Sequence, residues 1–303
     1  MKPSATWFTL ACIGLIGVSL VFTNIGSAEI DPSNVVAAYL FDIENPDVLI
    51  DWSGNRNHGQ INREVKYIDG KFGKAIQFDP RRKNFIDLGK PLLNDLAEFT
   101  IVAWVNKASE EWDQPEGIVG QHDVIELFLT RRSTLMLMAY PLSETHKKKH
   151  IHGHRHDGAG CLDAKICISA LLKLPGPDFK WEDEESWVHL AAIGDAAIMR
   201  NTRNAARGAQ KRVNKLNIGP VTSYGASANS TKIGGGGIFD PGEGVLDYFS
   251  GSIDELAIFN VALTLDEIKT LMAEGLESIG LIGQAVDQAG KLAVTWGELK
   301  HGI

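Results

Sequence analysis

Short runs of β-prone, apolar residues separated by turn clusters fill most of this sequence, and they constrain the fold more than any other feature. The turns carry Gly, Asn, Asp and Pro, as at Ser53-Gly54-Asn55 and Asp69-Gly70. The runs lie at 35–41, 75–78, 84–88, 99–105, 124–129, 134–140, 187–193 and 252–259. This pattern predicts an all-β, antiparallel sandwich or jelly roll. Several runs are apolar on both faces, which favours two packed sheets.

One helix is predicted, near the C-terminal end. Thr264-Leu265-Asp266-Glu267 forms a capping box, in which the Thr hydroxyl and the Glu carboxylate satisfy backbone N–H groups at a helix start. Leu265, Ile268 and Leu271 follow with helical spacing, and Gly275 is a plausible end.

The N-terminus predicts export. Lys2 precedes an apolar run, 8–22, and Gly26-Ser27-Ala28 ends it with small residues. We expect a signal peptide over 1–28, a sandwich domain over 29–276 and a tail over 277–303. The run is shorter than the roughly 20 residues that span a bilayer, although a retained anchor is the alternative. The expected location is secreted, periplasmic or cell-surface, with no membrane insertion after cleavage.

Charge and cysteine content narrow the choice of partners. The formal net charge of −8 disfavours nucleic acid and anionic membranes, which both need a basic surface. Cys12 should leave with the signal peptide. Cys161 and Cys167 then form either a disulfide, in an oxidising compartment, or two free thiols beside a strand.

An ordered set of motifs lies at 39–42, 51–59, 69–79, 99–105, 187–191 and 251–260, followed by the capped helix. In this order the motifs resemble those of laminin-G-like jelly-roll domains of the concanavalin-A-like superfamily. The resemblance covers roughly residues 36 to 275 and implies a two-sheet antiparallel jelly-roll sandwich with one short C-terminal helix. Trp104 and Trp187 are expected to pack in the core and are large enough to join its two layers.

The resemblance also suggests calcium, which prefers oxygen ligands. Some pentraxin-like relatives place two adjacent ligands just before an aromatic residue, and Lys83 and Asn84 occupy these positions here. Asn84 could serve as a ligand, whereas Lys83 replaces the other ligand with a cation. The second ligand group follows an Ile-Gly pair in those relatives, and here Ile233 to Gly237 has no side-chain ligands. Asp240, Glu243 and Asp247 lie a few residues on and could compensate. A separate structural Ca²⁺ would bridge the first and last strands through Asp42 and Asp254; otherwise these two residues cap a turn and a strand end.

Sugar binding and catalysis require different residues. Trp112, in a polar loop, is the best candidate for stacking on a sugar ring, and the alternative is a ring folded onto the core edge. A glycosidase needs two carboxyls across a cleft. The acidic run 182–185 lacks alternate spacing, and Asp123 and Glu126, three residues apart, are expected on opposite faces of a strand. No catalytic carboxylate pair is therefore predicted.

Two stretches carry no clear element. The histidine-rich stretch 146–161 is expected to be a solvated loop, with metal binding as the alternative, and the basic stretch 200–215 is either a helix or a hairpin. The function predicted is an exported non-catalytic module that recognises carbohydrate or a protein partner through edge loops. The alternatives are a structural or adhesive cell-envelope component and, less favoured, a polysaccharide-active enzyme of the same fold.

Overall fold

The computed structural model describes residues 29–108, 114–129, 135–139, 142–143, 168–171, 187–195, 198–203, 206–212, 221–238 and 247–281. The predicted signal peptide, both cysteines of the mature chain and the histidine-rich stretch lie outside these residues. Among the helices that are described, none combines the length and the apolar character that a membrane crossing requires.

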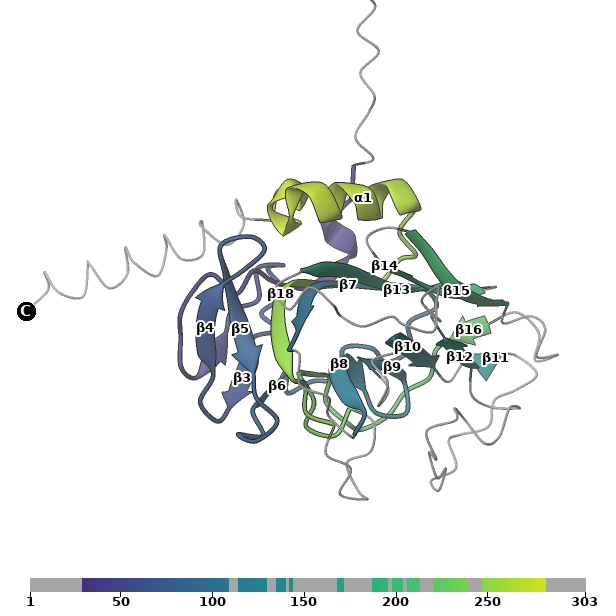
Figure 1. Cartoon of the computed structure of the whole chain (residues 1–303). Helices are drawn as coiled ribbons and strands as arrows, with labels where there is room; N and C mark the ends of the chain where they lie inside the picture. The colour runs from purple at the N-terminus through teal and green to yellow at the C-terminus, as the bar shows by residue number, and fades with distance from the viewer. Residues whose placement is uncertain are drawn as a thin grey trace, which may run out of the picture.

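Two antiparallel sheets form the molecule, as the sequence predicts (Figure 1). Sheet A runs β15-β14-β13-β7-β18-β5-β4, and β1 also pairs with β18. Sheet B runs β12-β10-β9-β8-β17-β6-β3-β2, and a small third sheet pairs β11 with β16. The strands of sheet A are β1 (Val35–Tyr39), β4 (Lys66–Asp69), β5 (Lys74–Phe78), β7 (Phe99–Lys107), β13 (Val188–Gly194), β14 (Ile198–Arg203), β15 (Ala206–Arg212) and β18 (Gly251–Phe259). Those of sheet B are β2 (Val48–Leu49), β3 (Gly59–Asn62), β6 (Phe85–Asp87), β8 (Glu116–Gln121), β9 (Ile125–Leu129), β10 (Leu135–Ala139), β12 (Ile168–Leu171) and β17 (Lys232–Ile233), and the small sheet holds β11 (Leu142–Ser143) and β16 (Val221–Ser223).

The main core fills the space between sheets A and B. Alternate residues of β7, Phe99, Ile101, Ala103 and Val105, are all buried there, because successive side chains of a strand point to opposite faces. From sheet B, β9 contributes Ile125, Leu127 and Leu129. Each large aliphatic side chain that is fully buried contributes about 1.5–3 kcal/mol, so this layer supplies most of the stabilisation.

A second apolar cluster covers the outer face of sheet A. Helix α1 (Leu265–Glu274) lies over this face, on the side away from β8 and β9 (Figure 1). Its Ile268 and Leu271 are buried against sheet residues that include Val102 and Phe259. The short 3-10 helix η3 (Leu276–Ile279) and Leu281 join the same cluster. The predicted tail starts at 277, whereas the packed part of the chain continues to 281.

Strand β18 is buried along its whole length and contacts three other strands. Its first residues pair with β5 (Ile253 with Ile76), and its later ones pair with β1 (Leu256 with Tyr39). The register with β7 shifts between Asp254 and Ala257. Glu255, with φ of 50°, marks this β-bulge, which re-aims the neighbouring side chains.

Two sequence expectations are resolved here. The described parts of the basic stretch 200–215 are paired strands rather than a helix, because β14 and β15 pair antiparallel, as the hairpin alternative predicts. Trp104 is buried, as expected for core packing, but it does not join the two layers. Its neighbours Ala103 and Val105 face the inter-sheet core, so Trp104 faces outward and packs under Phe72. Trp187 is half-buried just before β13.

The capping box of α1 forms as predicted, since Thr264 Oγ1 accepts from the Glu267 N–H (3.3 Å) and Glu267 Oε2 accepts from the Thr264 N–H (2.6 Å).

Thr264→Ala should lower the free energy of unfolding by about 1 kcal/mol, because the N-cap acceptor is lost. Denaturant unfolding measures this. The control Thr270→Ala, at a half-buried position within the helix, should be neutral or slightly stabilising. Equal effects of both variants would contradict the assignment.

Candidate functional site

The outer face of sheet B carries a row of polar side chains. Strand register places Gln60 beside Asp87, Asp87 beside Lys232, Lys232 beside Gly120, and Gly120 beside Glu126. The adjacent residues in each strand point into the inter-sheet core, so this row faces away from it. Those core residues are Ile61, Ile86, Val119, Ile233, Ile125 and Leu127.

Polar groups along this row differ in how firmly they are held. Gln60 is exposed, whereas Asp87 and Lys232 are half-buried. Asp87 Oδ1 accepts from the Gly89 N–H at 2.8 Å. Lys232 Nζ donates to the Gly236 carbonyl at 2.7 Å and lies 5.8 Å from the centroid of the Phe85 ring. The face therefore offers hydrogen-bonding groups whose positions are set by the backbone.

Two half-buried aromatic rings, Phe85 and Tyr248, lie beside the row. Their centroids are 6.2 Å apart and the rings are tilted by 44°. Gly236, with φ of +79°, packs against Phe85 so closely that a Cβ there would lie 2.5 Å from the ring. Only glycine fits this position, which explains part of the glycine run that starts at Gly234. The combination of ring faces and polar groups is suited to an amphipathic ligand.

Two of the five predicted ligand-binding residues, Asn84 and Asp247, are described, and both are buried. Asn84 accepts from the Asp79 N–H (2.9 Å) and donates to the Glu64 carbonyl (2.8 Å), so it holds the turn before β6. Asp247 accepts from the Gly237 N–H (2.8 Å) and supports the glycine run. Trp112, Asp240 and Glu243 lie outside the described residues, and the ligand role of the whole set stays a prediction.

Asp42 and Asp254, the predicted calcium ligands, hold the same turn between β4 and β5. Asp42 Oδ1 accepts from the Lys74 N–H at 2.7 Å. Asp254 Oδ2 accepts from the N–H groups of Lys71 (2.8 Å) and Phe72 (3.0 Å). Residues from the beginning and the end of the domain thus meet at one turn, where both accept backbone hydrogen bonds, and their role as calcium ligands stays a prediction.

The charge at this turn is poorly compensated. Asp254 is fully buried, and its Oδ1 has no hydrogen-bond partner among the described residues. Burial, with a smaller contribution from the charge of Asp42, raises the pKa of Asp254 to about 7. Burial likewise raises the pKa of Glu255 to about 8, with the Asp254 and Asp42 charges adding to it. A cation bound here would stabilise the ionised carboxylates.

A buried row crosses the outer face of sheet A next to this turn. Register places His189 beside Trp104 and Trp104 beside Asp254. Phe72 packs edge-on against Trp104, with centroids 6.4 Å apart, and Lys71 Nζ lies 4.7 Å from the centroid of the indole. The β4–β5 turn therefore covers the row, and burial lowers the pKa of His189 to about 4.

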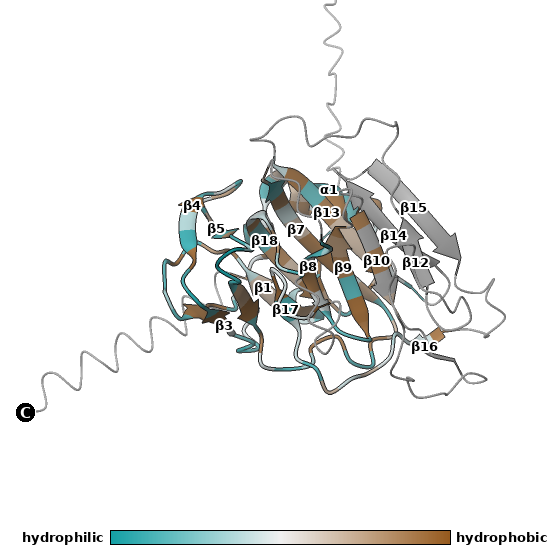
Figure 2. Ribbon diagram, turned by 60° about the horizontal axis from the view of Figure 1, so that its bottom comes forward, coloured by the Kyte–Doolittle hydropathy of each residue, from teal (hydrophilic) through white to brown (hydrophobic). Residues whose placement is uncertain are grey.

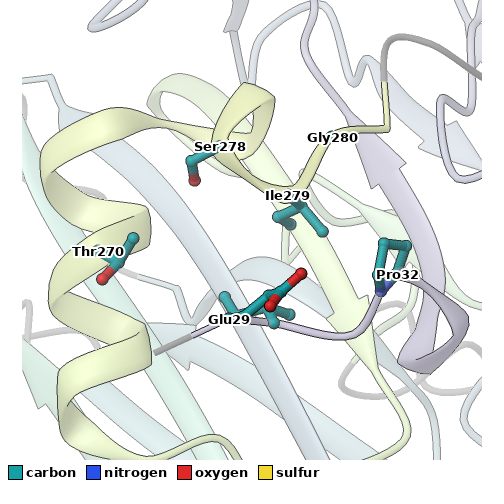
Figure 3. A pocket seen from close by; sticks show the side chains of 7 residues that line it. Glu29, Pro32, Thr270, Ser278, Ile279 and Gly280 are labelled. Carbon is teal, nitrogen blue, oxygen red and sulfur yellow. The ribbon is translucent and has the colours of Figure 1, made fainter. Parts of the chain in front are cut away.

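A pocket of about 370 Å³ lies between the beginning of the domain and the end of α1 (Figure 3). Its hydroxyl groups already have backbone partners, since Thr270 donates to Asp266 and Ser278 donates to Gly275. Glu29 is the one ionisable residue in its lining. The pocket therefore offers few polar groups to a ligand, and we assign no ligand to it.

The expectation that Asp123 and Glu126 lie on opposite faces of a strand is wrong. Asp123 belongs to the turn before β9 and has φ of 65°. Its N–H donates to Glu126 Oε1 at 2.9 Å, and His122 lies beside both carboxylates. The rule of alternating faces does not apply across a turn, which is why the sequence analysis missed this cluster. The sequence signal that could have revealed the cluster is one histidine and two acidic residues within five positions, 122–126.

The sequence matches no protein-family model and no curated protein. Solved structures of the same fold include the binding domain of Paraclostridial Mosquitocidal Protein 1, at a TM-score of 0.52 and 15% identity over 79% of this chain and 52% of that one. The binding domain of botulinum neurotoxin serotype G gives 0.51 and 12% over 78% and 50%. The binding domain of botulinum neurotoxin DC, in complex with SialylT, gives 0.51 and 11% over 80% and 51%.

These likenesses establish the class of fold, a two-sheet antiparallel β-sandwich. The chain spans about half the length of each of these structures. At such low identity the comparison concerns the fold alone.

Burial of His189 predicts sensitivity to acid. The unfolded chain, with an imidazole pKa near 6.5, binds more protons than the folded chain between pH 6.5 and 4, so stability falls as the pH drops through this window. His189→Gln should make that slope shallower by up to about 1.4 kcal/mol per pH unit. Denaturant unfolding at several pH values measures it, with exposed His58→Gln as the control for removing a histidine. An unchanged slope in the His189 variant would contradict the prediction.

Proposed function

We propose that this chain is an exported, non-catalytic binding module of the laminin-G-like kind, which recognises carbohydrate through the outer face of sheet B. The observation that carries the proposal is the row of Gln60, Asp87 and Lys232 beside the rings of Phe85 and Tyr248. Function on this fold depends on such a site, because β-sandwiches carry many unrelated activities.

The chemistry of this face suits a sugar. Pyranose rings present apolar C–H faces and equatorial hydroxyls, so aromatic side chains next to hydrogen-bonding groups complement them. Gln60 and Asn62 are exposed and offer both donors and acceptors. Asp87 adds an acceptor and Lys232 a donor, both at fixed backbone positions. The edge-loop candidate Trp112 remains a second place at which the same ligand could stack.

Export supports the same proposal. The predicted signal peptide would deliver the mature chain, residues 29–303, outside the cytoplasm, where polysaccharide and glycoprotein ligands occur. A partner protein that bears glycans would be recognised by the same groups.

Carbohydrate binding can be tested on a glycan array with the mature chain. Gln60→Ala and Tyr248→Ala should each weaken binding to the best glycan about tenfold or more, because each removes a contact of the proposed face. The matched control is Gln77→Ala, a glutamine that is also exposed on a strand but lies in sheet A; it should bind like the wild type.

Different outcomes separate the competing sites. Equal binding by wild type, Gln60→Ala and Tyr248→Ala would overturn the assignment to this face and direct attention to Trp112. Absence of binding to every glycan would overturn the carbohydrate proposal and favour a protein ligand or a structural role.

We also propose that Asp42 and Asp254 hold a structural Ca²⁺ at the β4–β5 turn. The fit rests on Asp254 Oδ1, which is buried without a protein partner, and on carboxylate oxygens being the ligands that Ca²⁺ prefers. The ion would link the first and last parts of the domain and would hold the turn that covers Trp104.

Calcium should therefore stabilise the fold. At a concentration 100-fold above Kd, binding to the folded state alone adds about 2.7 kcal/mol, which raises the melting temperature by about 5–10 °C for a chain of this size. The measurement compares thermal unfolding in Ca²⁺ and in EDTA. Asp254→Asn should abolish the difference, whereas Asp87→Asn, in sheet B, should retain it. A wild type that melts equally with and without Ca²⁺ would overturn this proposal.

A further inference from the structure

The turn between β8 and β9 gathers one imidazole and two carboxylates. His122 Nε2 lies 3.3 Å from Asp123 Oδ1, and His122 Nδ1 lies 3.5 Å from Glu126 Oε1. One ligand atom from each of the three residues can be chosen so that all lie within 4.8 Å of one another. The three residues come from one short segment, so the turn itself sets their geometry.

Glu126 has an unusual environment for a carboxylate. It is the charged residue of an otherwise hydrophobic strand, and β9 in Figure 2 shows one hydrophilic band between hydrophobic ones. Its side chain is fully buried. Oε1 accepts from the Asp123 N–H, whereas Oε2 has no hydrogen-bond partner among the described residues. A buried carboxylate oxygen without a partner carries a large desolvation cost, which a bound cation would remove.

The packing around Glu126 explains why water does not reach it. It lies on the outer face of sheet B, because its neighbours Ile125 and Leu127 face the core. Gly120 is its partner on β8, and the side chain of Ile238 lies directly over that glycine. The carboxylate is therefore enclosed by an apolar side chain on one side and by the turn residues on the other.

We propose that His122, Asp123 and Glu126 bind a divalent transition-metal ion, and that Zn²⁺ fits best. Imidazole nitrogen and carboxylate oxygen are both zinc ligands, with bonds of about 2.0–2.2 Å, so the ligand atoms of a tetrahedral site lie about 3.3 Å apart. The His122 Nε2–Asp123 Oδ1 separation is close to this value, and the His122 Nδ1–Glu126 Oε1 separation is slightly longer. Because the two separations involve different ring nitrogens, only one of them can be an edge of the site. One nitrogen would coordinate the ion, and the carboxylate beside the other nitrogen would move toward it within the 4.8 Å cluster.

The presence of an imidazole selects against Ca²⁺ and Mg²⁺, which prefer oxygen. Three protein ligands also leave a fourth position, which water or a ligand atom would reach from the side of the partly exposed His122 rather than past the enclosed Glu126. Glu126 shares its register row with Lys232 and Asp87, so the ion would lie on the face to which carbohydrate binding is assigned. The metal proposal goes beyond that function and does not depend on it.

The test is zinc binding by the full mature chain after treatment with a chelator and dialysis. Titration calorimetry with ZnCl₂ should detect one tight equivalent, and thermal unfolding should show a higher melting temperature with zinc. Glu126→Gln should weaken the tight site at least tenfold and remove the rise in melting temperature. The control is Glu116→Gln, another buried glutamate, on the adjacent strand β8. This variant breaks the buried ion pair with Lys107 and lowers stability, but it should retain zinc binding and the zinc-dependent rise in melting temperature.

A second variant covers the case in which Glu126→Gln does not fold. Asp123→Asn removes a carboxylate but retains a residue that tolerates the positive φ of this position, so the turn should be preserved. It should also weaken the tight site at least tenfold. Unchanged affinity and unchanged zinc-dependent stabilisation in both acidic variants would overturn the proposal and assign zinc to the histidine-rich stretch 146–161. A wild type that neither binds zinc in the titration nor melts at a higher temperature with zinc would also overturn the proposal. In that case a protonated His122 would be the cation that compensates the two carboxylates.

Discussion

Strand β18 holds the domain together by pairing with three other strands. Its first half completes sheet A with β5 and its second half with β1, while β7 pairs along most of its length. One strand can change partners in this way because the β-bulge at Glu255 shifts the register. The same bulge turns Asp254 toward the β4–β5 turn and Glu255 toward the end of α1. The final strand thus joins the beginning of the domain to its end.

Buried carboxylates outside the main core are the chemical consequence. Asp254 and Glu255 lie over the outer face of sheet A, and Glu126 lies over the outer face of sheet B. Burial raises the pKa of each of these side chains, to about 7 or 8, because a charge in a low-dielectric environment lacks solvation. Asp254 and Glu126 each retain one oxygen without a partner among the described residues. The inter-sheet core is mostly apolar, and the buried carboxylate of Glu116 is paired there with Lys107 Nζ at 3.2 Å. The poorly compensated charges therefore lie at the outer faces and the ends of the domain rather than in its central packing.

Local patterns in the sequence predicted the elements well, and relations between elements less well. The capping box at Thr264 and the helix end at Gly275 formed as expected, because caps are interactions within a few residues. Trp104 was expected between the layers, but the period-two rule does not say which of two apolar faces turns inward; its pairing with neighbours that face outward decided this. The cluster of His122, Asp123 and Glu126 was missed because a turn, rather than a continuous strand, separates the two acids.

The amino-acid sequence alone was enough to predict the fold class, most of the β-runs and the helix. These follow from local propensity, from alternation of side chains, and from motifs in a familiar order. Which polar side chains share a face became evident only in the folded chain. The row of Gln60, Asp87 and Lys232 draws on strands far apart in the chain, and its alignment depends on register. Strand register is set by contacts across the two sheets, and these contacts join residues that are far apart in the sequence. No local stretch of sequence is therefore enough to predict it.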